Sequence, residues 1–158
     1  YEYGDEKASR KIAKAIVQYR ANKLMNTTIE LTRTIETVLK RTGKTHPATK
    51  SFQAIRIHVN NELHHLKMVL SKLHDALKVG GVIVIISFHS LEDRIVKNFF
   101  RDNSGYFSEN YKHLPQKNIS NNKPQLKIIT KKIIKASFAE TKMNSRARSA
   151  KLRAAEKL

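Results

Sequence analysis

The sequence predicts an α/β protein in which several helices precede part of a doubly wound sheet. Apolar residues recur every three to four positions through most of residues 5–77, as in amphipathic helices. Two glycines then precede an apolar, largely β-branched run at residues 82–88, and a second amphipathic stretch follows it. The order helix, strand, helix is half of a doubly wound α/β unit.

The composition indicates a globular protein with a large excess of positive charge. Of 158 residues 40% are hydrophobic, and 31 Lys and Arg against 13 acidic residues give a net charge of +18. Residues 111–158 carry most of this excess. Such a charge favours a polyanionic partner, nucleic acid first. Without cysteine, disulfides and thiolate zinc sites are excluded, and without a long apolar run we expect no membrane span and a cytoplasmic protein.

Two helices are expected at the beginning of the chain. The first spans residues 5–20, where the apolar positions have a helical period. The second follows Thr27, because Thr27 and Glu30 have the spacing of a capping box. We expect Gly43 to end it.

The third expected helix is the most regular feature of the sequence. Its apolar residues alternate at steps of three and four over residues 47–77. Asn60 and Asn61 are poor helix formers, so the helix is either continuous or bent or split there. We expect it to bridge two packing units and to end at Gly80 and Gly81.

The strand at residues 82–88 and the turn after it form the first candidate site. The run lacks alternation, so we expect a strand covered on both faces. Ligands of open parallel sheets bind beyond such strand ends, where His89, Ser90 and Glu92 stand. Two interpretations remain open. In the first, Ser90 caps the next helix, and Glu92 and Asp93 interact favourably with the helix dipole in its first turn. In the second, His89 and a carboxylate position a substrate or a proton.

The remaining sequence predicts one long loop and two more strands. Residues 102–125 are rich in Asn, Ser and Lys and read as a surface loop. Strands are expected at 126–134 and around 150–156, with a helical turn between them at 137–149.

Two sets of polar residues are candidate RNA contacts. Gln53, Arg56 and Asn60 share one face of the third helix, which is either a solvated face or a contact with RNA or a neighbouring domain. The basic tail either is plain charged surface or binds phosphates in a salt-sensitive way. Its cations are Arg146, Arg148, Lys151 and Arg153.

No metal site and no cofactor loop are expected. His64 and His65 lie near His58 and His74, but adjacent histidines on a helix point about 100° apart and no carboxylate has regular ligand spacing with them. None of the glycines has GxGxxG spacing. They are Gly4, Gly43, Gly80, Gly81 and Gly105.

Four blocks of the sequence resemble one family. These are DEKASRKIAKAIV at 5–17, HPATKSFQAIRIHVNNEL at 46–63, GGVIVIISFHSLEDRIVKNFF at 80–100 and NSRARSAKLRAAEK at 144–157. In this order they are similar to the C-terminal half of the bacterial 16S rRNA cytosine-N(4) methyltransferases of the MraW family. Asn144-Ser145 stands where the family usually has Asn-Pro.

The resemblance implies a Rossmann-like methyltransferase fold interrupted by an inserted helical domain. Residues 1–60 would be the later part of that insertion, and residues 61–158 the C-terminal part of the catalytic domain. The family transfers a methyl group from S-adenosyl-L-methionine to N(4) of a cytidine in the decoding region of 16S rRNA. Its cofactor and catalytic loops lie upstream of every residue present, so we expect an incomplete and inactive portion, with His89, Ser90 and Glu92 lining the cleft.

Two other functions remain open. The chain could be a non-catalytic basic RNA-binding module, or one half of an enzyme completed by a separate chain. A half-sheet would also expose a strand edge through which two copies could pair.

Overall fold

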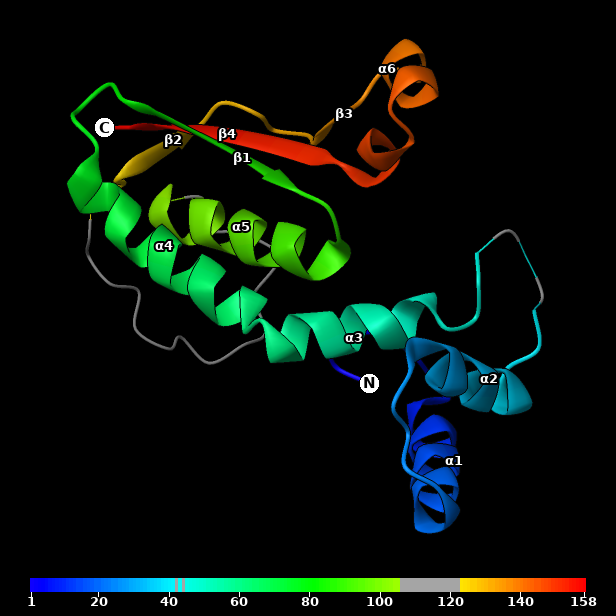
Figure 1. Ribbon diagram of the computed structural model, residues 1–158. Helices are drawn as coiled ribbons and strands as arrows, with labels where there is room; N and C mark the ends of the chain where they lie inside the picture. Colours follow the sequence, from blue (N-terminus) through cyan, green and yellow to red (C-terminus); the bar gives the residue numbers. More distant parts are fainter. Residues whose placement is uncertain (42, 44, 106–122) are drawn as a thin grey trace, which may run out of the picture. The chain divides into compact units, whose positions relative to one another are not determined.

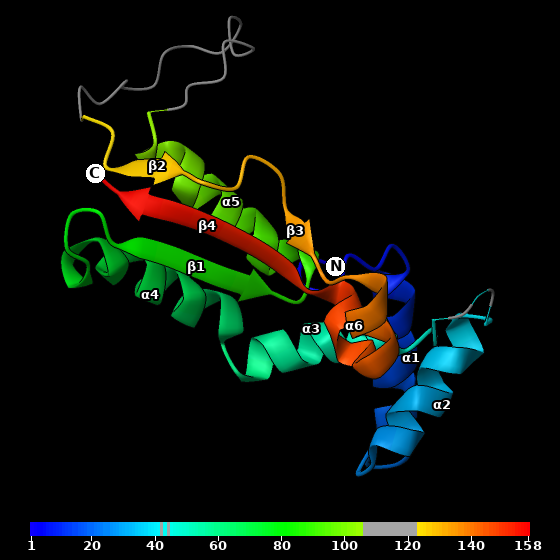
Figure 2. The ribbon, with the colours of Figure 1, turned by 90° about the horizontal axis from the view of Figure 1, so that it is seen from above.

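The computed structural model describes residues 1–41, 43, 45–105 and 123–158. The chain divides into two compact units, Tyr1–Glu62 and Leu63–Leu158. Figures 1 and 2 show helices in the first unit, and helices with a sheet in the second. This mixture is consistent with the predicted α/β class. The assignment of 1–60 to an inserted domain and of 61–158 to a catalytic domain stays a prediction.

Three helices form the first unit: α1 (Ser9–Asn22), α2 (Thr28–Val38) and α3 (Thr49–Val59). α1 and α2 confirm the two helices expected at the beginning of the chain, but α1 begins at Ser9 and not at residue 5, and α2 ends at Val38 and not at Gly43. Leu39 already has an extended backbone, with φ −118° and ψ 116°, so the helix stops before any glycine. The buried apolar side chains at the centre of this unit are Ile12, Ile35 and Ala48.

The start of α2 is the predicted capping box. The Thr27 hydroxyl accepts from the Glu30 amide at 3.2 Å, and the Glu30 carboxylate accepts from the Thr27 amide at 3.1 Å. Lys23 and the Tyr19 hydroxyl also donate to this carboxylate, at 2.8 and 3.0 Å. The bond from Lys23 comes first among the contacts that lower the pKa of Glu30 to about 2. One acidic side chain therefore joins the end of α1 to the start of α2.

The long expected helix is split at its two asparagines. α3 ends at Val59, and α4 (Glu62–Ala76) begins three residues later. Asn61 has φ 51°, in the left-handed region that interrupts a right-handed helix and that asparagine tolerates better than most residues. The boundary between the two units falls at Glu62.

The sheet of the second unit contains strands β1 (Val82–Ser87), β2 (Leu126–Ile128), β3 (Ile134–Lys135) and β4 (Lys151–Lys157). The strand order is β1-β4-β2, with β3 also paired to β4, and these pairings are all antiparallel. The predicted strand at 126–134 is therefore two short strands. The open parallel sheet that we expected is not formed by these strands, because β4 runs between β1 and β2 in the opposite direction.

Only one face of β1 is covered within the second unit. α4 and α5 (Ser90–Asn103) lie on the same face of the sheet (Figure 1). The outward side chains Val82, Val84 and Ile86 are 51 to 56% exposed. The prediction of a strand covered on both faces is thus wrong for the described part of this unit. An apolar sequence shows that a strand can be buried, but not which segments are present to cover it. The buried residues of the covered side are Leu70, Ile83, Val96, Phe100, Leu126 and Ala155.

The remaining elements follow the predicted order. The expected helical turn consists of α6 (Phe138–Met143) and the 3-10 helix η2 (Ser145–Ser149). Of the predicted loop at 102–125, residues 106–122 lie outside the described residues. No described helix is both long and apolar enough to cross a membrane.

Glu30→Gln should remove an acid-sensitive stabilisation of the first unit. Because the folded-state pKa of about 2 lies below the ordinary 4.5, the contribution of the carboxylate is present above pH 4.5 and is lost as the pH falls through about 2. A carboxyl NMR titration should place the Glu30 midpoint near 2, and the difference in unfolding free energy between parent and variant should shrink over that range. Glu2→Gln, at an exposed carboxylate, is the control. A Glu30 midpoint near 4.5 would contradict the assignment.

Candidate functional site

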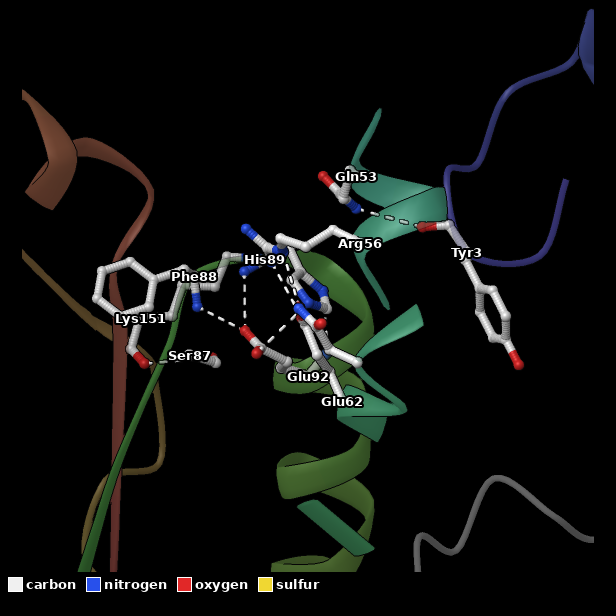
Figure 3. A network of polar contacts seen from close by, with 10 residues as sticks. Tyr3, Gln53, Arg56, Glu62, Ser87, Phe88, His89, Glu92 and Lys151 are labelled. Carbon is white, nitrogen blue, oxygen red and sulfur yellow. Dashed lines mark hydrogen bonds and ion pairs between the residues drawn. The ribbon is translucent and has the colours of Figure 1, made fainter. Parts of the chain in front are cut away.

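The turn between β1 and α5 is closed by its own side chains. His89, not Ser90, is the N-cap of α5: its Nδ1 accepts from the Glu92 amide at 3.3 Å. Glu92 Oε2 in return accepts from the amides of Phe88 and His89, at 2.8 and 3.3 Å (Figure 3). The prediction that Ser90 caps the helix is therefore wrong by one residue, because the imidazole nitrogen supplies the acceptor that a hydroxyl usually provides.

The capping bond also defines the tautomer of His89. Since Nδ1 accepts a hydrogen bond, the neutral ring carries its proton on Nε2, which lies 3.4 Å from Glu92 Oε1. The His89 side chain is only 7% exposed, that of Glu92 is 23% exposed, and Ser90 is exposed. The turn thus holds an imidazole and a carboxylate in a defined geometry. The catalytic roles of His89, Ser90 and Glu92 stay predictions.

A second polar contact joins α5 to β4. Arg153 donates two hydrogen bonds to Asp93, at 2.7 and 3.2 Å, and both side chains are nearly buried at 13 and 14% exposure. Lys151 Nζ lies 4.0 Å from the same carboxylate. The Ser87 hydroxyl donates to the Lys151 carbonyl at 3.4 Å. Sequence analysis missed this contact, because nothing local links two residues 60 positions apart.

The polar stripe on α3 has partners within the first unit. Gln53 donates to the Tyr3 carbonyl at 3.3 Å (Figure 3). Arg56 forms two bonds to Glu62, at 2.8 and 3.1 Å, and Asn60 donates to the same carboxylate at 3.2 Å. The Arg56 side chain is nevertheless 55% exposed. These bonds account for the stripe without a ligand, and an RNA contact by these three residues stays a prediction.

The four cations of the basic tail fall into two pairs. Arg146 and Arg148 lie on η2, are exposed, and have no acidic partner among the described residues. Lys151 and Arg153 lie on β4 and face Asp93. Only the first pair is therefore able to meet an incoming phosphate without breaking an ion pair.

Fold and turn together define an α/β protein with a candidate positioning site at a strand end. The family model described as the MraW methylase family matches residues 1–158. The chain therefore belongs to that family.

Curated relatives agree with this assignment. The chain is 48% identical to "Ribosomal RNA small subunit methyltransferase H" of Rickettsia felis over 159 aligned positions, which are 100% of this chain and 52% of that protein. It is 46% identical to the protein of the same name from Rickettsia prowazekii, with the same coverage. The chain spans about half the length of these relatives.

His89→Ala should destabilise the second unit, because the Glu92 amide loses its capping acceptor. We expect a loss of about 1 kcal/mol in urea denaturation. His89→Asn, whose amide oxygen is a good capping acceptor, should recover most of that loss. An equal loss in both variants would show that the buried ring, and not the cap, stabilises the turn.

Asp93→Ala should be more costly, because it leaves the nearly buried guanidinium of Arg153 without its carboxylate. We expect about 2 kcal/mol lower unfolding free energy in urea denaturation. Asp102→Ala removes the partner of Arg101 in a pair that is 37 and 62% exposed, and should cost less than about 0.5 kcal/mol. Similar losses in the two variants would contradict the structural role of the Asp93–Arg153 contact.

Proposed function

We propose that this chain is the C-terminal portion of an S-adenosyl-L-methionine-dependent methyltransferase that acts on N(4) of a cytidine in the decoding region of 16S rRNA, in the cytoplasm. The observation that carries the proposal is the 48% identity, over the entire chain, to a relative named for methylation of small-subunit ribosomal RNA. The net charge of +18 suits an RNA substrate.

The portion is incomplete and inactive by itself. In support, the relatives are about twice as long, and β1 ends the strand order with its second edge unpaired among the described strands. Val82, Val84, Ile86 and Phe88 are all more than half exposed on this strand and the turn after it. An apolar face with an open edge is what a neighbouring strand and its helices would cover. Two copies pairing through that edge would instead give a homodimer.

In the complete enzyme, His89, Ser90 and Glu92 would line the cleft and hold the target base by hydrogen bonds. When bound, the cofactor supplies the methyl group as an electrophile on sulfur, so the reaction needs alignment more than a protein nucleophile. The Glu92 carboxylate, whose side chain is 23% exposed, offers an acceptor for that alignment, and His89 holds it in place through the capping box. No glycine of this chain has GxGxxG spacing, so we assign none of its residues to the cofactor.

RNA contacts in this proposal come from two regions. Arg146 and Arg148 on η2 are exposed cations suited to phosphate, and Lys151 and Arg153 on β4 would add contacts to it. On α3, Arg56, Gln53 and Asn60 would contact RNA through their exposed edges. A second candidate function, a non-catalytic RNA-binding module, is favoured by the same exposed cations.

Reconstitution tests the proposal. The part of the Rickettsia felis relative that this chain does not match is mixed with the chain, unmethylated small ribosomal subunits and labelled S-adenosyl-methionine. Methyl transfer is expected from the mixture and from neither part alone. Calorimetry should show no cofactor binding by the chain alone. Transfer or cofactor binding by the lone chain would overturn its assignment as an incomplete portion, and RNA binding without transfer in the mixture would favour the module.

A matched pair of variants tests the exposed face in the same assay. Val84→Asp, at 56% exposure, should lower the recovered transfer by at least about tenfold, because burying an unpaired carboxylate costs several kcal/mol. Ile129→Asp introduces the same charge at 48% exposure beyond the end of β2 and should leave the transfer unchanged. Equal effects would remove the β1 face from the proposal.

A further inference from the structure

A groove in the second unit lies apart from the turn at His89. We call it the α5–β2 groove, and its volume is about 770 Å³, within the range of roughly 300–1,000 Å³ typical of ligand sites. It is lined by the C-terminal half of α5 and Ser104 after it, by residues between Pro124 and Lys131 that include β2, by Arg153 of β4, and by Leu158. The lining side chains that matter for its chemistry are Lys97, Arg101, Lys127, Lys131, Arg153 and Ile128.

Three of the five cations in the groove are held by acidic partners. Arg153 is fixed on Asp93, as described above. Arg101 pairs with Asp102 at 2.9 Å, and Lys127 with Glu156 at 3.4 Å. These acids neutralise much of the local field and hold the cationic side chains in place.

The other two cations give the groove its net positive charge. Lys97 on α5 and Lys131 after β2 are exposed, and neither has an acidic partner among the described residues. One comes from the helix and the other from the segment after β2. Two ammonium groups in one groove, without acidic partners among the described residues, suit the phosphates of one polyanionic strand.

The floor of the groove is apolar. Phe100 and Leu126 are each only 2% exposed and belong to the core, while Ile128 is half-buried and Pro124 is exposed. A groove with an apolar floor and cationic walls matches a nucleotide, whose base has flat faces that stack on apolar surface and whose phosphate is charged.

The groove lies at the end of the strand order opposite to the open edge of β1. β1 and β2 are at opposite ends of the strand order β1-β4-β2. Segments that pair with the open edge of β1 would therefore be separated from the groove by β1 and β4.

We propose that the α5–β2 groove binds single-stranded RNA, with phosphates on Lys97 and Lys131 and a base against the floor at Ile128 and Pro124. A groove of this volume admits individual nucleotides and not a double helix, whose bases are stacked inward. The proposal rests on the proposed function only in choosing RNA as the polyanion. It assigns RNA binding to α5 and β2, outside the contacts expected on η2 and α3.

Fluorescence anisotropy of labelled oligouridine with the full chain tests the groove. Lys97→Gln/Lys131→Gln should weaken binding roughly tenfold at moderate salt and lower the slope of log K against log salt by about 1.4, or 0.7 for each phosphate that is no longer neutralised. Arg94→Gln/Lys132→Gln is the matched control, since it removes two exposed cations outside the groove lining and changes the charge equally. Equally weakened binding in both pairs would overturn the proposal in favour of a diffuse positive field.

Competition identifies the ligand class. Unlabelled oligouridine should displace the labelled RNA at lower concentration than inorganic polyphosphate or polyglutamate of equal charge. Equal displacement by polyphosphate would overturn the base contact, and equal displacement by polyglutamate would overturn RNA as the ligand. Thermal unfolding of each variant verifies folding. This assay needs neither cofactor nor methyl transfer, so the two proposals can fail separately. If reconstitution fails but the groove variant alone weakens RNA binding, only the proposed function is rejected. If reconstitution succeeds but the groove and control variants bind RNA equally, only the groove proposal is rejected.

Discussion

The second unit depends on β4, because every strand pairing described in the sheet is made to this strand. β1 pairs with it along its whole length, from Val82 opposite Glu156 to Ser87 opposite Lys151, and β2 and β3 occupy its other side. At its centre Ala155 is fully buried and faces Ile83 and Ile128 across the two pairings. Such a small side chain lets α4 and α5 pack closely on this face. Without β4, the described pairings leave β1 and β2 with no partner at all.

The same strand determines where the candidate site lies. Arg153 of β4 holds Asp93, which stands in the first turn of α5, directly after Glu92. Because the helix start is bound to the central strand, the capping pair of His89 and Glu92 is held against the carboxyl end of β1. The position of the turn is therefore a tertiary property, although its internal hydrogen bonds are local.

Local interactions were predictable from the sequence and non-local ones were not. Thr27 and Glu30 are three residues apart, so their capping box and the helix after it follow from spacing alone. The β1 run was recognised as a strand, but the exposure of Val84 depends on which segments surround it. Arg56 and Glu62 are six residues apart, and they meet across the interruption where Asn61 is left-handed. Predicting the Arg56–Glu62 pair required knowing that the long helix is split at Asn60 and Asn61. From the sequence, a continuous helix and a bent or split one were both possible.

The closed cap also bears on how this chain can bind an anion. An uncapped helix N-terminus offers its amides to phosphate. At α5 the amides of Phe88 and His89 donate to Glu92, and the amide of Glu92 donates to His89. A carboxylate already occupies the place of an anion there, so a phosphate would have to displace it and meet its charge. The start of α5 is therefore a poor site for an anion, and any attraction of the described residues for phosphate has to come from cationic side chains.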